Sequence, residues 1–479
     1  MLGVWVLLHW APSHAQAPHF SSAEARSHYE KAVGLGERSQ WRGAMLELNR
    51  ALEYEPNNPE ILVELGIAWG GLMEWDKATK VLQRALRLAP NSVRAHYNLG
   101  VTLDRASPGQ YLGIPEYRKA LEINPVDVGS LINLAAGIGY RDGEEARRLL
   151  RKALQLDPKS GRAHFNLALL LKNAGDPQGA IERMQQAVEL APESLEFRRQ
   201  LVSLLVSEGR SDEAVIHCRA ILKLDENDWN SHYTLGRVLI RQGKKEEGER
   251  ELQKVQEIQR YLKGQEAVEK MVSMGASALA EAKFEEATKQ FAAALEIDKG
   301  SVQALMYLGV ALAAMGHPDQ GTEKLNQAIK IDPSSPWAHL NLGTLLLQAG
   351  RIDQAQIEFE KALELDPYFP EAHSNLGLIL AKNNQAKSAI NHFRMASQLN
   401  PQYLEALFNL GIALRSANQI GEAAQVFRQA AEVAPDNPQV QYALGMTLRD
   451  KGDLAGAKQA LDRANALQRQ AESNANNHK

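Results

Sequence analysis

The sequence predicts an all-α solenoid, a stack of about thirteen helical hairpins, and two observations carry this prediction. First, a segment of 34 residues, Pro336 to Phe369, is followed by another of 34, Pro370 to Tyr403, that repeats its pattern almost position for position. Second, the recurring residues of each segment fall on one stripe of a helix and then on one stripe of a second helix. Each segment is therefore expected to form a helical hairpin that stacks on its neighbours.

The recurring residues keep a fixed register, in which Pro336 stands at position 1 of its unit. A Leu-Gly pair occupies positions 7 and 8, and Ala, Phe, Ala and Pro occupy positions 20, 24, 27 and 32. Three consecutive units follow this register without an insertion: Leu342, Gly343, Ala355, Phe359, Ala362 and Pro367; Leu376, Gly377, Ala389, Phe393, Ala396 and Pro401; and Leu410, Gly411, Ala423, Phe427, Ala430 and Pro435. Such a period indicates one supersecondary unit repeated many times.

Position 8 predicts how the two helices of a unit meet. Glycine inside a helix costs about 1 kcal/mol relative to alanine, yet glycine recurs at this position, and Ala32, Ala135 and Ala168 replace it as the next smallest residue. We therefore expect close helix contact there. Proline at position 32 cannot extend the second helix, so it predicts where that helix ends.

Extending the register outward places thirteen units between Ala25 and Ala471. The resulting organisation is a signal peptide at 1–15, a linker at 16–24, a first repeat block at 25–262 with repeats 1–7, an insertion or lengthened helix at 263–267, a second repeat block at 268–471 with repeats 8–13, and a polar tail at 472–479. The extra residues follow a charged run, Lys244 to Arg260, that contains no proline, so we expect a lengthened helix. The last helix is expected to end near Gln470, before a disordered tail.

With this period, its Leu-Gly pair and its closing proline, the unit resembles the tetratricopeptide repeat. The resemblance covers almost the whole chain. It implies a right-handed superhelical solenoid whose inner, concave surface binds extended peptides or protein segments.

Composition and cysteine content exclude several classes of function. The chain has 54 basic and 58 acidic residues and a net charge of −4, so nothing favours nucleic acid or an anionic membrane as the main partner. The single cysteine, Cys218, stands at position 24 of the sixth unit and is expected to be a small buried apolar residue. A disulfide within the chain is excluded, and no cysteine near the amino terminus can accept a lipid.

The first residues resemble the end of a secretory signal. An apolar run from Leu2 to Leu8 is followed by Ser13 and Ala15, which fit the small-residue rule for cleavage after Ala15. The run is far shorter than the about 20 residues of a spanning helix, so we expect an exported, periplasmic or secreted protein without stable membrane insertion. Because no basic residue precedes the run, an uncleaved anchor or an ordinary hydrophobic tail of a cytoplasmic protein stays an alternative.

No catalytic, cofactor or metal site is predicted, because the chain has no phosphate loop, no Gly-x-Ser-x-Gly elbow, no paired cysteine motif and no His-Glu-x-x-His. Histidines do recur at position 4, as His96, His164, His232, His339 and His373. Equivalent positions of stacked hairpins lie on the order of 10 Å apart, whereas zinc ligands lie within about 2.1 Å of one ion. We therefore expect these histidines to pack between hairpins.

Asparagines recur at position 6 in two groups, and they are the candidate ligands for a bound peptide. The groups are Asn98, Asn133 and Asn166, and Asn341, Asn375 and Asn409. Position 6 lies beside the packing stripe and is expected to face the concave side. An asparagine amide offers a donor and an acceptor, so a row of them can pair with the backbone of an extended peptide whatever its side chains.

These units resemble those of the repeat region of the eukaryotic O-linked N-acetylglucosamine transferase, with which they share the His-x-Asn-Leu-Gly wording. The resemblance implies that the six asparagines bind peptide backbone. It does not carry the transferase activity, because only a short polar tail follows the repeats here. Gln200, Thr234, Ser273 and Tyr307 interrupt the row, so two short ladders are expected; retention of tolerated polar residues after duplication is the alternative.

Basic residues at positions 12 and 13 offer a lining for acidic partners, or else form a solvated face. They include Arg105, Lys172, Lys382 and Arg415. The carboxylate clamp of chaperone-binding repeat proteins is absent, since it needs asparagine at position 9, where this chain is mostly apolar.

The sequence thus predicts a noncatalytic scaffold that binds protein or peptide clients in a concave groove. Two alternatives remain: a substrate adaptor for a separate enzyme, such as a glycosyltransferase or a secretion or assembly machine, and a structural assembly factor that uses the convex face or the ends.

Overall fold

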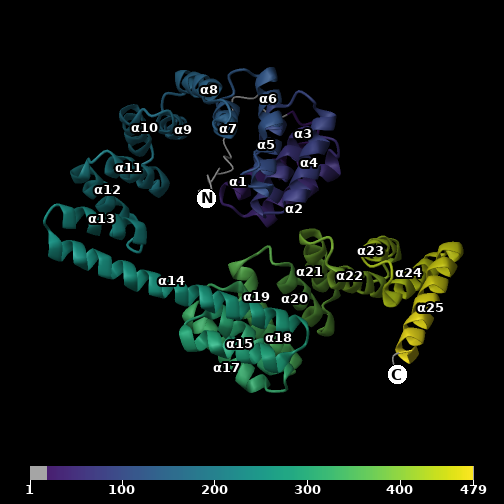
Figure 1. The fold of residues 1–479 in the computed structure, drawn as a ribbon. Helices are drawn as coiled ribbons and strands as arrows, with labels where there is room; N and C mark the ends of the chain where they lie inside the picture. The colour runs from purple at the N-terminus through teal and green to yellow at the C-terminus, as the bar shows by residue number, and fades with distance from the viewer. Residues whose placement is uncertain (1–18, 478–479) are drawn as a thin grey trace. The chain divides into compact units, whose positions relative to one another are not determined.

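The computed structural model describes residues 19–477, and the surroundings of side chains for residues 19–470. The expected signal peptide at 1–15 lies outside the described residues. Two compact units divide the chain between Leu262 and Lys263; we name them the amino-terminal block and the carboxy-terminal block. Every regular element of the described residues is an α-helix (Figure 1).

The helices of the amino-terminal block are α1 (Ala23–Glu37), α2 (Trp41–Tyr54), α3 (Pro59–Gly71), α4 (Trp75–Leu88), α5 (Val93–Ala106), α6 (Ile114–Ile123), α7 (Val128–Ile138), α8 (Gly143–Leu156), α9 (Gly161–Asn173), α10 (Pro177–Leu190), α11 (Leu195–Ser207), α12 (Ser211–Leu224) and α13 (Trp229–Arg241). Helix α14 (Lys245–Ala280) crosses the boundary between the blocks. The carboxy-terminal block continues with α15 (Phe284–Ile297), α16 (Val302–Ala314), α17 (Pro318–Ile331), α18 (Pro336–Gln348), α19 (Ile352–Leu365), α20 (Pro370–Lys382), α21 (Ala386–Leu399), α22 (Leu404–Ser416), α23 (Ile420–Val433), α24 (Pro438–Lys451) and α25 (Leu454–Asn477).

Consecutive helices pack as hairpins, from α1 with α2 to α24 with α25. Helix α14, with 36 residues, takes part twice. Its start packs on α13, where Glu251 binds His232, and its end packs on α15, where Gly275 lies against Phe291. Thirteen hairpins result, which confirms the predicted all-α solenoid. Residues 263–267, assigned to an insertion or a lengthened helix, lie within α14, where Tyr261 and Leu262 beside them are exposed.

Local sequence explains where the helices begin and end. Ser92, Ser160 and Ser335 each precede the first helix of a hairpin, and each hydroxyl accepts a hydrogen bond from the backbone N–H three residues on. Second helices end two residues before the closing proline, as α19 does at Leu365 before Pro367. The predicted helix end is therefore confirmed, although α12 and α15 end at the same position before Glu226 and Lys299, so proline is not required for it.

Position 8 is where the two helices of a hairpin touch. A Cβ atom added to Gly66 would lie 2.5 Å from Cγ of Leu82, and one added to Gly343 would lie 2.7 Å from the ring of Phe359. The same overlap recurs at Gly100, Gly275, Gly377, Gly411 and Gly445. The predicted close contact is thus confirmed at these glycines, where no side chain would fit without a shift of its neighbours.

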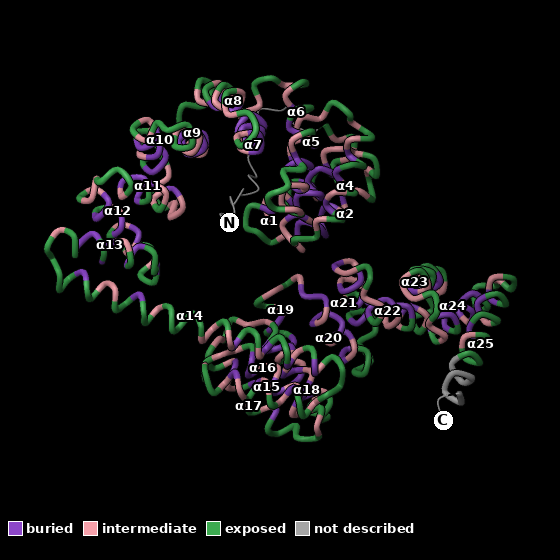
Figure 2. Tube along the Cα trace, viewed as in Figure 1, coloured by how far each residue is buried: buried purple, intermediate pink, exposed green. Residues whose placement is uncertain are grey.

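The core runs between the paired helices, as the buried residues of Figure 2 show. The rings of Phe359, Phe393 and Phe427 are at most 1% exposed. Cys218 is fully buried, and burial raises the pKa of its thiol to about 12, which confirms its predicted role as an apolar core residue. The core is therefore distributed along each block in successive clusters rather than gathered at one centre.

The structure corrects the predicted end of the last helix. Helix α25 runs to Asn477, past Gln470 and into the residues expected to be a disordered tail. The sequence after Gln470 contains neither proline nor glycine, so no residue there ends the helix.

Replacing Gly377 with alanine is expected to destabilise the protein. The new Cβ atom would lie 2.7 Å from the buried ring of Phe393. Overpacking of this kind costs about 1–3 kcal/mol, which outweighs the roughly 1 kcal/mol that alanine gains in helix propensity. Urea unfolding followed by circular dichroism measures the loss.

Gly421→Ala is the matched control, because an added Cβ atom meets no atom within 4 Å there. If both variants unfolded at the same urea concentration, close packing at position 8 would not be the reason for glycine.

Candidate functional site

The first helices of successive hairpins form the surface on which the candidate residues lie. They contact one another directly, as α3 does with α5 and α7 with α9 in the amino-terminal block, and as α16 does with α18 and α20 with α22 in the carboxy-terminal block. Side chains at positions 2, 6 and 9 therefore meet across neighbouring hairpins. We name this the first-helix surface of each block.

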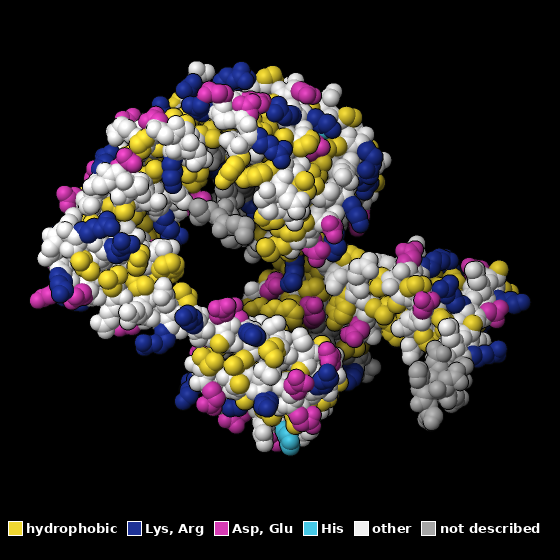
Figure 3. All heavy atoms as spheres, viewed as in Figure 1, with side chains coloured by type: hydrophobic (Ala, Val, Ile, Leu, Met, Phe, Trp, Pro, Cys, Tyr) yellow, Lys and Arg dark blue, Asp and Glu magenta, His cyan; other side chains and the backbone are white. Residues whose placement is uncertain are grey.

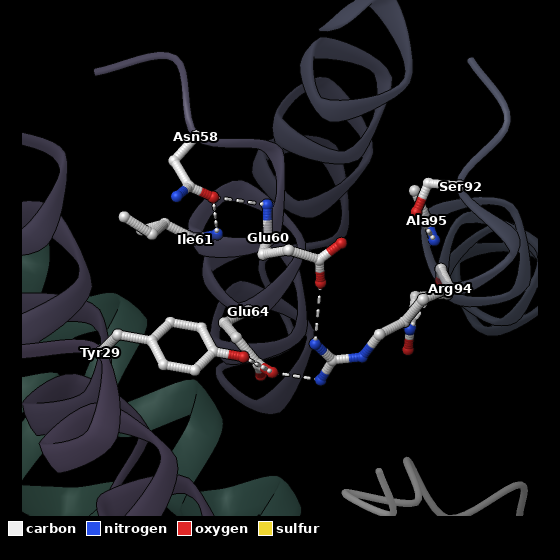
Figure 4. Close-up of polar contacts among 9 residues, drawn as sticks. Tyr29, Asn58, Glu60, Ile61, Glu64, Ser92, Arg94 and Ala95 are labelled. Carbon is white, nitrogen blue, oxygen red and sulfur yellow. Dashed lines mark hydrogen bonds and ion pairs between the residues drawn. The ribbon is translucent and has the colours of Figure 1, made fainter. Parts of the chain in front are cut away.

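A buried polar cluster joins the first three hairpins of the amino-terminal block (Figure 4). Glu64, at position 6 of α3, is 1% exposed and accepts hydrogen bonds from the hydroxyl of Tyr29 on α1, at 3.1 Å, and from the guanidinium of Arg94 on α5. Arg94 also forms an ion pair with Glu60 at 3.5 Å. Burial raises the pKa of the Glu64 carboxyl, and the charge of Arg94 opposes that effect. The cluster is thus a buried carboxylate compensated by one arginine.

The same contact between position 2 and position 6 recurs two hairpins further on, but without a carboxylate. Arg162 Nη2 of α9 donates to Asn133 Oδ1 of α7 at 3.3 Å. Asn133 is 5% exposed, and its Nδ2 has no hydrogen-bond partner within the described residues, although the hydroxyls of Tyr97 and Tyr117 lie nearby. Arg105 Nε is also buried without a partner, and burial, followed by the charge of Arg162, lowers the pKa of Arg105.

The other two asparagines of this ladder are also buried, whereas asparagines that line an open groove would be exposed. Asn98 and Asn166 are 6% and 8% exposed. The Nδ2 group of Asn98 donates to the carbonyl of Arg94 on its own helix at 2.9 Å. Because neighbouring first helices pack against each other, they cover much of position 6 in these hairpins.

The asparagines of the carboxy-terminal block are more open. Asn341, Asn375 and Asn409 are all half-buried, on α18, α20 and α22. Asn375 Nδ2 donates a long hydrogen bond of 3.4 Å to Thr344 Oγ1, and the side chains of the other two make no hydrogen bond within the described residues. Most of their donors and acceptors are therefore free for a ligand.

The candidate basic residues lie in three different environments. Lys172 and Lys382 are exposed, and neither forms an ion pair within the part of the chain that the structure describes. Arg415 is paired with Asp450 at 2.8 Å and lines a shallow pocket with Ile412. Arg105, half-buried and unpaired, differs from all of these. The structure does not bring the four together as one basic lining.

The two ladders differ in the charge that flanks them at position 2. In the amino-terminal block this position holds Arg94 and Arg162, whereas in the carboxy-terminal block it holds Glu371 and Glu405. Glu371 Oε2 is buried without a hydrogen-bond partner in the described residues. Elsewhere acidic and basic side chains are interspersed, as on the face shown in Figure 3. The side chains at position 2 are therefore basic beside the first ladder and acidic beside the second.

The histidines at position 4 connect each first helix to the loop before it. His96 is 6% exposed; its Nε2 lies 3.0 Å from the carbonyl of Pro90 and its Nδ1 lies 2.6 Å from Glu116. His232 and His339 repeat this arrangement with Glu251 and Glu358. These side chains are buried, as predicted, but they pack inside their own hairpins and not between hairpins, because a glutamate of the second helix lies within hydrogen-bond distance of each.

His373 differs from the others because its partner is a second histidine. Its Nδ1 lies 2.9 Å from Nδ1 of His392, and its Nε2 lies 3.0 Å from the carbonyl of Pro367. One Nδ1 atom must accept a hydrogen bond from the other, so both rings cannot be charged together. Burial, assisted by His392, lowers the pKa of His373 to about 4, although the Pro367 carbonyl and Asp366 oppose this.

Sequence reasoning missed Glu64 and Arg94, which form the most buried ion pair of the first-helix surface. The register itself contained the signal. Glu64 stands at position 6, where asparagine is common, and Arg94 stands at position 2 of the next unit. A pair of opposite charges at these two positions indicates a contact between neighbouring first helices.

Within residues 19–470 no group of three or more histidine, cysteine or acidic side chains is arranged to hold a metal ion. Among the described helices, none combines the length and the apolar composition needed to cross a membrane.

Replacing Arg94 with methionine is expected to destabilise the amino-terminal block by about 3–5 kcal/mol, because it leaves the Glu64 charge buried without its partner. Chemical unfolding monitored by circular dichroism measures the effect. A second replacement, Glu64→Gln, should restore most of the loss in the same chain. Wild-type stability of the Arg94→Met variant would show that Glu64 carries no buried charge.

The His373–His392 pair predicts that the protein loses stability as pH falls from about 6.5 towards about 4. Over this range an unfolded chain protonates residue 373, whereas the folded chain, with its lowered pKa, does not, so acid favours unfolding. The difference between 6.5 and about 4 corresponds to about 3 kcal/mol at most. Urea midpoints measured across this pH range test it.

His373→Gln is the matched variant, because Gln441 occupies the same position in the thirteenth hairpin and donates to the carbonyl of Pro435 at 3.0 Å. Glutamine keeps the backbone contact and does not titrate. The stability of the variant should depend less on pH than that of the wild type. If the dependence were unchanged, groups other than His373 would cause the loss of stability in acid.

Comparison with known proteins agrees with this architecture. Two family models, both described as tetratricopeptide repeat, match the chain: one over residues 171–228 and 312–379, the other over residues 141–194, 273–336 and 408–472. Together these ranges include more than half of the sequence. A search of curated proteins found no match.

Solved structures of several repeat proteins are similar to parts of the chain. YrrB, described as a TPR protein with an unusual peptide-binding site, is 25% identical and aligns with 37% of this chain and 92% of its own, with a TM-score of 0.32. PilF of Pseudomonas aeruginosa is 21% identical over 41% and 90% of the two chains, with a TM-score of 0.38. The Cut9–Hcn1 structure is 16% identical over 93% and 94%, with a TM-score of 0.39.

The family models rest on the sequence, and the hairpin pairing rests on the structure. The residues that the family models match are the same ones that form helical hairpins in the structure. The chain therefore belongs to the tetratricopeptide repeat family.

Proposed function

We propose that the protein is a noncatalytic scaffold that binds extended segments of other proteins along its first-helix surfaces. The observation that carries this proposal is the row of half-buried asparagines in the carboxy-terminal block, Asn341, Asn375 and Asn409. They stand at the same position of three consecutive hairpins, and their side chains keep unused donors and acceptors.

The chemistry of these side chains suits a peptide backbone. An extended peptide presents an N–H and a carbonyl at regular intervals, and one asparagine amide can pair with both. The single hydrogen bond within this row, from Asn375 to Thr344, is 3.4 Å long, so a ligand can replace it at little cost. Binding through the backbone does not depend on the side chains of the client.

Apolar side chains beside the row support the same function. Trp337, at position 2 of α18, is 46% exposed, and Ile412, at position 9 of α22, is 41% exposed. Both are large apolar residues on the surface that carries the asparagines. They offer contact area to the side chains of a bound segment, which adds affinity to the backbone hydrogen bonds.

Presentation on a solenoid makes such weak contacts useful. Each asparagine is held by a helix that is already packed on its neighbours, so binding orders few protein groups. Contacts made by successive hairpins then act together, because the first one holds the segment close to the next.

Replacing Asn341, Asn375 and Asn409 together with alanine is expected to weaken the binding of short unstructured peptides by at least about tenfold, since each lost hydrogen bond contributes about 0.5–1.5 kcal/mol. Binding of the purified full chain to an array of immobilised peptides of varied sequence measures this. The loss should be similar for peptides of different sequence, because the contacts are made with the backbone.

Asn326→Ala with Asn391→Ala is the matched control, because both residues are exposed on second helices, α17 and α21. Circular dichroism checks that helicity is unchanged in both variants. Equal binding by the triple variant and the control would rule out the asparagine row as the peptide site.

A further inference from the structure

We infer that the first-helix surface of α5, α7 and α9 binds a carboxylate of the captured segment, held by Arg105, Arg162 and Asn133. This inference rests on the proposed function and adds a chemical preference to it. The amino-terminal block would thereby select segments with an acidic side chain or a free carboxy terminus.

An internal comparison within the same block carries the inference. Arg94 of α5 reaches back to position 6 of the preceding hairpin and there meets the carboxylate of Glu64. Arg162 of α9 reaches back in the same way and there meets the neutral amide of Asn133 at 3.3 Å. The first contact compensates the arginine charge, and the second does not. A carboxylate from a ligand would supply what Glu64 supplies in the first case.

Donors without a partner lie on the first helices around this second contact, and Arg105 is close enough to Arg162 for the two charges to interact. Asn133 is 5% exposed, and its Nδ2 makes no hydrogen bond within the described residues. Arg105 Nε, on the neighbouring first helix, is buried and also has no partner there. A buried donor without an acceptor costs about 1–3 kcal/mol. Donors of this kind, together with an arginine that binds only an amide, fit an anionic acceptor.

The carboxylates of the chain that lie near these groups do not bind them. Asp104 accepts hydrogen bonds from the N–H of Gly113 at 2.7 Å and from the hydroxyl of Tyr117 at 2.9 Å. Asp127 caps α7 by accepting from the N–H of Ser130 at 2.8 Å. Burial raises the pKa of Glu196, and the charge of Arg162 opposes this effect. Glu196 forms no hydrogen bond or ion pair within the described residues. Among the described residues, Arg105 and Arg162 therefore have no carboxylate in contact with them.

Tyr97 and Gly129 give the site its shape. A Cβ atom added to Gly129 would lie 2.9 Å from the ring of Tyr97, so the ring lies directly against the start of α7. Position 2 of this hairpin thus carries no side chain, whereas the hairpins on either side carry Arg94 and Arg162 there. The ring fills the place of the missing side chain, next to the amide of Asn133.

Charge also explains why the second ladder should not share this preference. Glu371 and Glu405 flank the asparagines of the carboxy-terminal block at position 2. A carboxylate on a ligand would be repelled there and attracted at Arg105 and Arg162. Arginine pairs with carboxylates through two parallel hydrogen bonds, which favours this group over a neutral amide.

The test compares the full chain with its Asn133→Glu variant on an array of short immobilised peptides. Three sets share the same neutral residues: one carries an internal aspartate and an amidated end, one a free carboxy terminus, and one neither charge. Wild type should bind the charged sets about tenfold more tightly than the neutral set, or about 1.4 kcal/mol. The set that shows the gain identifies the source of the carboxylate.

Asn133→Glu places a carboxylate where Glu64 stands in the earlier contact, so it should abolish the preference and raise the unfolding midpoint of the protein. Arg162→Gln is a second variant, which should lose the preference without that stabilisation. Asn391→Glu adds the same charge at an exposed position of a second helix, α21, and should leave the preference intact.

The outcomes separate the two proposals. A preference that is absent, or that survives Asn133→Glu, overturns the carboxylate site, while backbone capture stands if all three sets still bind. Failure of every set to bind, charged or neutral, overturns the proposed function and the inference with it.

Discussion

Most hairpins of this protein depend on the close approach of their two helices at a glycine in position 8. At these glycines a side chain has no room, because a large side chain of the second helix occupies the space, as Phe393 does beside Gly377. The other hairpins carry Ala32, Ala135, Ala168 and Val202 at this position. This contact sets the angle and spacing of each pair, and each pair presents its first helix to the next. The polar surface of the first helices is thus a consequence of apolar packing on their other side.

Contacts between neighbouring first helices then decide which polar groups are available. A buried carboxylate at position 6, such as Glu64, is compensated by the arginine of the next hairpin, and that pair acts as a structural link. Where asparagine takes its place, as at Asn133, the same geometry leaves charge and donors unsatisfied. One repeated arrangement therefore gives either a compensated ion pair or an arginine that contacts only an amide, depending on a single side chain.

Much of the fold and part of the candidate site are predictable from the sequence. The period, the glycines at position 8 and the prolines at position 32 predict the hairpins and their limits, because these residues act through local conformation and through one nearest contact. The burial of the Asn98, Asn133 and Asn166 side chains is not predictable in this way. It depends on how far the adjacent first helix covers position 6, which is set by packing between units.

The sequence by itself determined the all-α class, the number of hairpins and the packing role of the histidines and of Cys218, because each follows from a register with a fixed spacing. Only the tertiary structure decided that Arg94 forms an ion pair whereas, among the described residues, Arg162 and Arg105 form none. It also decided that the asparagines of the carboxy-terminal block are the more open ones. The physical reason is that charge compensation and burial depend on contacts between neighbouring hairpins, about 30 residues apart in the sequence. The sequence of one repeat alone does not specify these contacts.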